Sequence, residues 1–329
     1  MNETVAPPVT CTPVPASRHI PSLAEDVRNG LLGEEMTLPP KYFYDERGSH
    51  LFDRICDEPE YYPTRTEDAL LARSAAEIMT TTRPQRILEL GSGTSRKTRR
   101  LLDACNDIGL RPVYAPFDVC DEILLHASEG LTSEYPWLRI DALAGDYTAG
   151  LDGVPAGASP QLVVFLGGTV GNFDERGADI ILADIRALMQ RGDWLLIGVD
   201  RVKEPEVLHA AYNDSAGITA DFNQNLLAVL NRELTADFDV DSFAHYSIFN
   251  PRASQIEMYL VAMRDMRIRL QALDESLEVE EGDAILTEIS RKYTRTGAEA
   301  MLEHAGFAVQ RHFEADGGAY SLLLAQVAD

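Results

Sequence analysis

The stretch of sequence that decides the fold is residues 86–98, RILELGSGTSRKT. Its first residues form a short apolar run typical of a buried strand, and the two glycines that follow allow a tight turn. The residues after the turn are expected to form a helix. A strand, a glycine turn and a helix in this order let the backbone approach a ligand closely at the carboxyl edge of a parallel sheet. The stretch therefore predicts a strand–helix unit of an α/β fold.

The same alternation continues toward the C-terminus. Further strands are expected at 112–119, 138–147, 161–173 and 193–200, with helical segments between them. The run 161–173, QLVVFLGGTVGNF, is almost continuously apolar, which indicates a strand in a sheet that is covered on both faces. The pattern predicts a doubly wound, Rossmann-like α/β sheet.

The alternation stops after Asp200. Residues 204–236 have a helical pattern, and strand-like runs follow, so 201–290 is expected to be an inserted α+β region. A helix and two closing strands in 291–329 would then complete the first sheet. The chain is therefore expected to leave the α/β domain at 200 and return to it at 291.

The chain before the sheet divides into two parts. Residues 1–18 are rich in Pro, Thr and Val without periodicity, and they are expected to form a flexible arm. Residues 19–63 are aromatic and turn-rich toward their end and are expected to form the N-terminal part of the substrate-binding region, and the α/β domain is expected to begin at 64. Two helix starts are expected from capping-box spacing, at Ser22 with Glu25 and at Thr64 with Glu67.

Composition and charge restrict the classes of partner. The chain has 329 residues and a net charge of −24, which argues against nucleic acid or an anionic membrane as a partner, since both need a basic surface. Four scattered cysteines without a C-x-x-C pair indicate free thiols in a reducing cytoplasm. The seven histidines show no metal-ligand spacing, so no metal site is expected. The start lacks the features of a signal peptide, and no apolar run is long enough to cross a bilayer.

The glycine turn and the strand ends indicate the ligand. A dinucleotide-binding turn usually has a third glycine where this chain has Arg96, so a pyrophosphate is not indicated. Asp118 ends the second strand, where an acid accepts hydrogen bonds from ribose hydroxyls, and Asp146 ends the third, where it can accept from an adenine amino group. An adenosine ligand without a pyrophosphate fits S-adenosylmethionine better than NAD. The alternative is that Glu89, Asp118 and Asp146 are solvated strand ends.

Four motifs together resemble one known family. They are LELGSGTSRKT at 88–98, KYFYDERGSHLFDRICDEPEYYPTRTE at 41–67, FLGGTVGNF at 165–173 and TEISRKY at 287–293. From about residue 20 onward the sequence resembles the bacterial L-histidine Nα-methyltransferases of ergothioneine biosynthesis. The resemblance implies a Rossmann-like class I S-adenosylmethionine-dependent methyltransferase sheet with an inserted α+β substrate-binding domain. It implies trimethylation of the α-amino group of L-histidine to hercynine, the first step of ergothioneine biosynthesis.

The resemblance also implies a set of site residues. Those expected to bind S-adenosylmethionine, with S-adenosylhomocysteine as product, are Gly91, Lys97, Asp118, Asp146 and Tyr147. Those expected to hold the amino-acid backbone of histidine are Tyr61, Asn172 and Tyr212. Glu288 and Ser290 would read the imidazole, Met258 would pack against the ring, and Tyr44 would line the site. Tyr44 and Asn172 would orient the amine nitrogen for catalysis. The expected protein is a cytoplasmic monomer with a small-molecule substrate and no metal.

Glu288 and Ser290 have a chemical reason to stand two residues apart. Side chains of a strand alternate, so Leu286, Glu288 and Ser290 are expected on one face and Ile285, Thr287 and Ile289 on the other. A neutral imidazole has one N–H donor and one bare nitrogen acceptor. Glu288 can accept from the N–H and Ser290 can donate to the other nitrogen. The alternative is that both residues are the polar face of a half-exposed strand.

Alternatives also remain for the other residues. Asn172 could cap a helix that starts near Phe173, Lys97 could be a solvated cation, and Met258 could belong to the core. The tyrosines Tyr44, Tyr61 and Tyr212 could be core residues whose hydroxyls find a partner. Three other functions are open: an NAD-dependent dehydrogenase, a methyltransferase of another amino acid or small amine, and a non-catalytic adenosine-binding protein.

Overall fold

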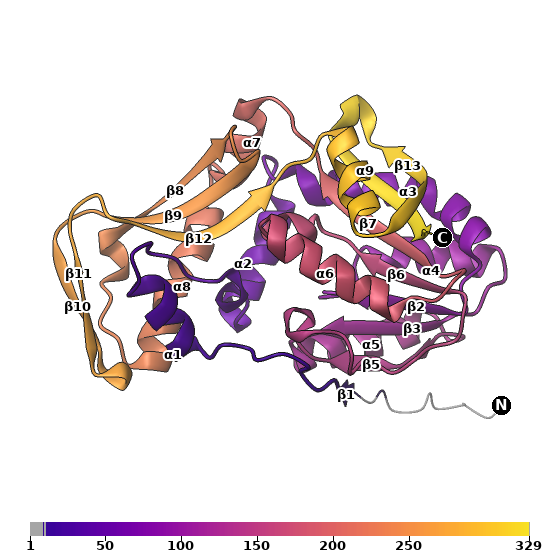
Figure 1. Ribbon diagram of the computed structural model, residues 1–329, viewed down its shortest axis with the longest axis horizontal. Helices are drawn as coiled ribbons and strands as arrows, with labels where there is room; N and C mark the ends of the chain where they lie inside the picture. Colours follow the sequence, from indigo (N-terminus) through magenta and orange to yellow (C-terminus); the bar gives the residue numbers. More distant parts are fainter. Residues whose placement is uncertain (1–8, 10, 329) are drawn as a thin grey trace. The chain divides into compact units, whose positions relative to one another are not determined.

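The computed structural model describes residue 9 and residues 11–328 (Figure 1). The described chain forms two compact units. Unit 1 contains the chain up to Ile20, Thr66–Arg201 and the chain from Tyr293 onward, and unit 2 contains Pro21–Arg65 and Val202–Lys292. The chain thus leaves unit 1 after Arg201 and returns to it at Tyr293.

The described part of unit 1 holds a nine-stranded sheet in the order β1-β5-β3-β2-β6-β7-β14-β13, with β4 paired to β3. Its strands are β1 (Cys11–Pro13), β2 (Arg86–Leu90), β3 (Val113–Asp118), β4 (Arg139–Ile140), β5 (Ala142–Ala144), β6 (Gln161–Phe165), β7 (Trp194–Asp200), β13 (Phe307–Glu314) and β14 (Tyr320–Val327). The strand pairs are parallel, except that β14 runs antiparallel to both β7 and β13. The predicted Rossmann-like α/β sheet is confirmed.

Helices cover both faces of this sheet, as the apolar strand 161–173 predicts. Alternate residues of β2 point to opposite faces, so Leu88 packs in one apolar cluster and Ile87 in another. The cluster around Leu88 includes α6 (Glu175–Leu188) and α9 (Arg295–His304). The cluster around Ile87 includes α3 (Tyr62–Thr82), α4 (Thr98–Asp107) and α5 (Asp121–Glu134). Side chains of the same strand thus contribute to both core layers, and helices such as α6 and α4 are drawn beside the sheet in Figure 1.

Unit 2 packs helices against a small antiparallel sheet. The sheet has the order β12-β9-β8, and a separate hairpin pairs β10 with β11. Its strands are β8 (Phe243–Asn250), β9 (Gln255–Ala262), β10 (Met266–Leu270), β11 (Glu275–Val279) and β12 (Ala284–Arg291), and its α-helices are α1 (Leu23–Asp26), α2 (Glu46–Asp57), α7 (Pro205–Tyr212) and α8 (Ile218–Leu234). Phe222 and Leu226 of α8 share one apolar core with Met258 and Leu260 of β9. The inner face of the sheet is therefore the face that carries Met258.

A β-bulge in β12 changes the predicted alternation. Ile285 pairs with Leu260, whereas Glu288 pairs with Met258, and the register shifts between Leu286 and Glu288. Residues directly opposite in a sheet share a face, so Glu288 and Ser290 lie on the inner face together with Ile285. The prediction that Leu286 shares their face is wrong, because the extra residue of the bulge inverts the alternation. The prediction that Glu288 and Ser290 lie on the same face of the strand is confirmed.

The described part of the predicted N-terminal arm contains a strand. Cys11–Pro13 form β1, which adds to the edge of the unit 1 sheet by parallel pairing with β5. The prediction of a flexible arm over 1–18 is therefore wrong for this part, because the backbone of β5 offers it hydrogen bonds. Residues 1–8 and residue 10 of that predicted arm lie outside the described residues.

The two predicted helix starts have different outcomes. The capping box of Ser22 and Glu25 is confirmed at α1. The capping box at Thr64 and Glu67 is wrong, because α3 already begins at Tyr62 and the Glu67 carboxylate accepts from the backbone N–H of Gly167 instead. The strand predicted over 161–173 also ends early, at Phe165, where Gly167 and Gly168 adopt positive φ and turn the chain.

Candidate active site

The glycine turn of unit 1 lies where the strand order reverses. Strand β2 has β3 on one side and β6 on the other, and ligands of open α/β sheets bind at the carboxyl ends of strands at such a point. Gly91 and Gly93 adopt φ values of 67° and 49°, which favour glycine. The backbone N–H of Gly91 donates to the Phe117 carbonyl at 2.8 Å. These contacts hold the turn against the end of β3.

The structure brings three predicted cofactor residues together around this turn. Asp118 ends β3 and accepts from the backbone N–H of Gly93 at 2.8 Å. A β-carbon on Gly91 would lie 3.5 Å from the ring of Tyr147. Asp146 is the residue before Tyr147 and accepts from the Thr148 N–H at 2.7 Å. Burial, with Asp118 and Asp146 nearby, raises the pKa of Tyr147, so its hydroxyl stays neutral and can donate.

This arrangement fits the adenosine part of S-adenosylmethionine. Carboxylates at the ends of β3 and β5 supply acceptors for hydroxyl and amino groups, and Tyr147 supplies an aromatic face. A β-carbon on Gly93 would meet nothing within 4 Å, so space remains beside the turn. The individual roles of Gly91, Asp118, Asp146 and Tyr147 stay predictions.

Lys97 is not the solvated cation that was the alternative. Its Nζ forms an ion pair with the carboxylate of Glu67, whose side chain is only 1% exposed. The two oxygens of Glu67 accept from the Gly167 N–H at 2.9 and 3.0 Å, and the Tyr320 hydroxyl donates to the same carboxylate at 2.8 Å. Glu67 therefore joins α3, α4, β14 and the turn after β6. Sequence reasoning missed this role of Glu67, although its position within an apolar helical stripe was a signal of burial.

Glu89 is also not a solvated strand end. It is buried in β2, and the hydroxyls of Thr98 and Tyr114 donate to its carboxylate. Burial raises the pKa of Glu89 to about 7, although these two hydrogen bonds act in the opposite direction. The Glu89 side chain therefore links β2 to the start of α4 and to β3. These contacts stabilise the elements on either side of the glycine turn.

Unit 2 gathers the three predicted tyrosines into one aromatic cluster. The rings of Tyr61 and Tyr212 meet edge to face at 6.1 Å between centroids. Phe52 connects Tyr61 to Tyr44, with centroid distances of 6.3 and 5.7 Å. Burial raises the pKa of Tyr61 well above its usual value, and Tyr212, Glu288 and Tyr44 add to the effect. Phe52 was missed as a member of this group, although it lies within the upstream motif.

The predicted imidazole-reading pair lies beside this cluster. Glu288 and Met258 are cross-strand neighbours on the inner face, and Met258 is buried in the core of unit 2, so the core alternative for Met258 agrees with its position. Ser290 Oγ accepts two hydrogen bonds, one from the Tyr212 hydroxyl at 2.9 Å and one from Lys292 Nζ at 2.8 Å. Burial raises the pKa of Glu288 to about 7, and Lys292 acts in the opposite direction. Lys292 was missed, although it continues the strand pattern two residues after Ser290.

Asn172 belongs to unit 1. It ends the short 3₁₀ helix η4 (Thr169–Asn172) and is half-buried. The capping alternative is wrong, because Asp174 is the N-cap of α6 and accepts from the Gly177 N–H at 2.7 Å. The predicted contact of Asn172 with the amino-acid backbone of the substrate stays a prediction.

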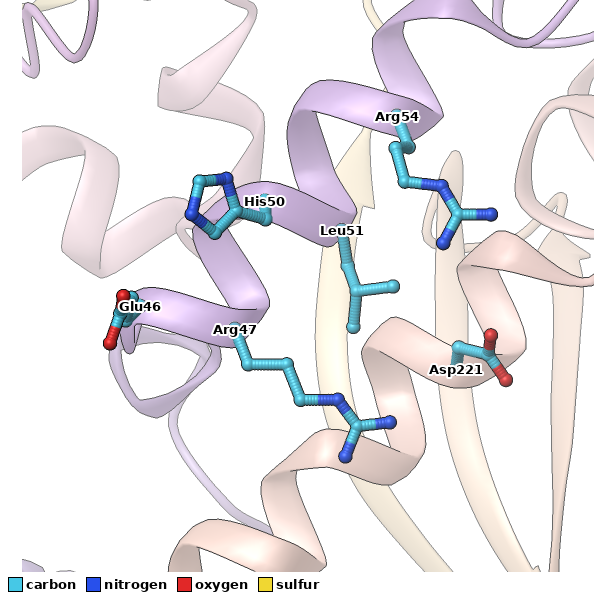
Figure 2. Close-up of a pocket in the computed structure, with 6 residues that line it drawn as sticks. All are labelled: Glu46, Arg47, His50, Leu51, Arg54 and Asp221. Carbon is cyan, nitrogen blue, oxygen red and sulfur yellow. The ribbon is translucent and has the colours of Figure 1, made fainter.

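A surface hollow of about 440 Å³ lies elsewhere in unit 2, between α2 and α8. Figure 2 shows Arg47, Leu51 and Arg54 of α2 reaching toward α8, which contributes Asp221. The remaining lining residues are Glu46 and His50. None of the predicted site residues lines this hollow.

The described residues contain no grouping of three or more His, Cys, Asp or Glu side chains that could hold a metal ion. All four cysteines are free thiols, as predicted. In the described chain, no helix combines the length and the apolar character needed to cross a membrane.

Comparison with known proteins decides the family. The model of the family described as "Histidine-specific methyltransferase, SAM-dependent" matches residues 23–327 of this chain. The chain belongs to the SAM-dependent histidine-specific methyltransferases. The resemblance stated from the four motifs is confirmed, and the NAD-dependent dehydrogenase and non-catalytic alternatives are wrong.

Three relatives of this histidine-specific methyltransferase are informative. The histidine N-alpha-methyltransferase of Mycolicibacterium smegmatis is 44% identical over 305 residues, which are 92% of this chain and 94% of the relative. The histidine N-alpha-methyltransferase of Mycobacterium tuberculosis is 42% identical over 304 residues, with the same coverage of 92% and 94%. The ergothioneine biosynthesis protein 1 of Neurospora crassa is 30% identical over 277 residues, which are 82% of this chain and 31% of that protein.

Proposed function

We propose that this chain transfers methyl groups from S-adenosylmethionine to the α-amino nitrogen of L-histidine until hercynine, the trimethylated product, is formed. This reaction would be the first step of ergothioneine biosynthesis, and S-adenosylhomocysteine would be the second product. The observation that carries the proposal is the position of Glu288 and Ser290 on the inner face of one strand. The names of the mycobacterial and fungal relatives support the same reaction.

Glu288 and Ser290 would recognise the imidazole ring. An ionised Glu288 accepts from the ring N–H, and Ser290 donates to the bare nitrogen. A site built to hydrogen-bond a ring in this way rejects an analogue that leaves its buried groups unpaired. Phenylalanine should therefore be excluded strongly. Met258, the cross-strand neighbour of Glu288, would pack against the ring.

The aromatic cluster and Asn172 would hold the amino-acid part of the substrate. The amine attacks only in its unprotonated form, and positioning supplies most of the acceleration. Tyr44 and Asn172 are proposed to orient the amine nitrogen by hydrogen bonds, while Tyr61 and Tyr212 hold the amino-acid backbone. Water is the proposed acceptor of the released protons. The faces of the tyrosine rings suit the growing cationic ammonium.

The residues around the glycine turn would bind the cofactor. When bound, S-adenosylmethionine supplies an electrophilic methyl group on a sulfonium whose leaving group is neutral. Asp118 is proposed to accept from the ribose hydroxyls, Asp146 to accept from the adenine amino group, and Tyr147 to cover the ring. Gly91 and Lys97 are proposed to bind the remaining part of the molecule.

We further propose that the protein works as a cytoplasmic monomer on a small-molecule substrate, without a metal, nucleic acid or membrane. The net charge of −24 supports the absence of nucleic acid and of an anionic membrane as partners, because a strongly acidic surface repels both.

Mass spectrometry of the reaction products tests the proposed function. Purified protein is incubated with S-adenosylmethionine and L-histidine, and phenylalanine and tryptophan are tested alongside. We expect trimethylated histidine and unchanged phenylalanine and tryptophan. Cofactor binding without any methylated histidine would contradict the proposed substrate and favour another amino acid or small amine on the same fold.

A further inference from the structure

A buried lysine follows the imidazole-reading pair. Lys292 is 3% exposed, and its Nζ lies 2.8 Å from Ser290 Oγ and 2.9 Å from Tyr212 Oη. Tyr212 Oη and Ser290 Oγ lie 2.9 Å apart, and the lysine Nζ also lies 4.9 Å from the centroid of the Tyr212 ring. Lys292, Ser290 and Tyr212 thus form a closed triangle within unit 2.

The directions of these hydrogen bonds follow from counting protons. An ammonium group can only donate, so both hydroxyl oxygens accept from Lys292. Tyr212 has one hydroxyl proton and donates it to Ser290 Oγ. Ser290 Oγ therefore accepts twice, which uses both of its lone pairs. Its own proton has no acceptor within the triangle and must be donated outward.

We propose that Lys292 is a positioning residue that fixes Ser290 as a hydrogen-bond donor and thereby makes the site select a ring with an acceptor nitrogen at that point. The inference rests on the proposed function, because it assumes that Ser290 contacts the ring of the substrate. A serine hydroxyl alone can donate or accept, so Glu288 and Ser290 by themselves do not determine which ring atom faces Ser290. The ammonium removes this ambiguity.

The loss of Lys292 has a specific consequence. Without the ammonium, the Ser290 proton is free to turn toward Tyr212 Oη, and Ser290 can then meet the ring as an acceptor. The bare nitrogen of histidine would lose its donor for part of the time. The penalty should appear in substrate affinity, because the ring is remote from the amine that reacts.

Substitutions at Lys292 and Ser290 test the proposal in the full-length protein. K292M should raise the KM for histidine about tenfold, which corresponds to the loss of one hydrogen bond to the ring, with a much smaller change in kcat. K292R keeps a cationic donor and should restore part of the affinity. S290A should raise KM by a similar factor. The K292M/S290A double variant should be no worse than S290A alone, because Lys292 acts through Ser290.

Lys203 provides a matched control. It is a second lysine of unit 2 that donates to a tyrosine, with its Nζ 2.6 Å from Tyr62 Oη and 4.2 Å from the ring centroid. K203M removes the same kind of contact away from Ser290 and should leave the KM for histidine unchanged. An equal increase of KM in K203M and K292M would overturn the proposal, since a general loss of packing would then explain both.

Two further outcomes would also overturn it while leaving the proposed function intact. In the first outcome, the wild-type enzyme trimethylates histidine, and the K292M variant folds and has an unchanged KM for histidine. The other is additivity of the K292M and S290A effects. Failure of the wild-type protein to methylate histidine would instead contradict the proposed function itself.

If K292M does not fold, binding of ring analogues to the wild-type protein decides the question by calorimetry. The two isomers β-(thiazol-4-yl)- and β-(thiazol-5-yl)-L-alanine place an acceptor nitrogen at one or the other imidazole position, and β-(thienyl)-L-alanine has none. We expect one thiazolyl isomer to bind about tenfold more tightly than the thienyl analogue. Equal Kd values for all three analogues would overturn the proposal.

Discussion

Glu288 is a carboxylate on the inner face of a strand, and its replacement should impair recognition of the ring. The loss of a hydrogen bond to a charged group costs about 1.5–3 kcal/mol, so E288A should raise the KM for histidine roughly 10- to 150-fold. The variant should also reject other aromatic amino acids less strongly. Steady-state kinetics with histidine, phenylalanine and tryptophan measure both effects.

Glu257 of the neighbouring strand β9 is the control for this substitution. Its carboxylate accepts from Asn250, Gln255 and Tyr259, and it pairs with Ile289, on the opposite face from Glu288. E257Q should leave the KM for histidine unchanged. Unaltered histidine kinetics in E288A would refute the imidazole-reading role.

Glu89 should make the protein less stable as pH rises through neutrality. Its pKa is about 7 in the folded protein, against a usual value of 4.5, so the folded state binds more protons between these values. The stability from this group is therefore fully present below pH 4.5 and is lost as pH rises through about 7. The difference is on the order of 3 kcal/mol. Urea unfolding at pH 5 and pH 7.5 should show a smaller decrease in E89Q than in the wild type, and an unchanged decrease would contradict this assignment.

Helix α3 is anchored by Glu67, whose partners Lys97, Gly167 and Tyr320 are all distant in the chain. Glu67 is buried whereas the Lys97 side chain is 21% exposed, so removing the carboxylate leaves a half-buried ammonium and two hydrogen-bond donors without their acceptor, at a cost of about 3 kcal/mol. E67A should therefore lower the free energy of unfolding by about this amount, and it should weaken binding of S-adenosylmethionine because Lys97 and the Gly167 turn lose their shared partner. Urea unfolding and calorimetric cofactor binding measure the two effects.

Glu77 lies on the same helix and serves as the control for Glu67. It forms an ion pair with Arg311 at 3.2 Å in which both side chains are more than half exposed. Such pairs contribute about 0–1 kcal/mol, so E77A should change stability little and cofactor binding not at all. Similar losses of stability in E67A and E77A would show that the effect comes from changing the helix in general and not from removing the buried contact of Glu67.

The elements of the sheet could be predicted from sequence because their signals are local. The apolar runs at β2 and β6 predict buried strands, and the glycines at 91 and 93 predict a turn, without reference to residues elsewhere in the chain. The bulge in β12 could not be predicted, since a period-two pattern contains no mark for one inserted residue. Strand β1 could not be predicted either, because three residues become a strand only through the backbone of β5.

The residues of the candidate site show the same difference between local signals and distant contacts. Asp118 was proposed from its place at a strand end, and Gly91 and the Glu288–Ser290 pair from the family resemblance of their motifs; their roles stay predictions. The contacts of Lys292 with Tyr212 and of Glu67 with Gly167 join residues 80 and 100 positions apart, so only the folded structure reveals them. Lys292 and Glu67 were missed because these partners are distant in the chain, whereas Phe52 was missed although its partners Tyr44 and Tyr61 are near it in the sequence.

The net charge of −24 should make the stability of the protein depend on salt. Excess charge of one sign repels itself in the compact state. The screening length falls from about 30 Å at 0.01 M salt to about 8 Å at 0.15 M. The Tm should therefore rise by a few degrees over this range, measured by calorimetry in a weakly ionised buffer. A falling Tm would show that attractive pairs such as Arg232 with Asp45 outweigh the repulsion.

The position of β14 matters while the protein is being made. β14 lies between β7 and β13, yet the ribosome makes it after both. Roughly 120 residues separate Asp200 at the end of β7 from Tyr320 at the start of β14, which takes about 6–24 s at usual rates of translation. During that interval β7 exposes an apolar edge that other nascent chains can pair with. Chaperones that shield this edge should therefore raise the yield of native enzyme in the cell.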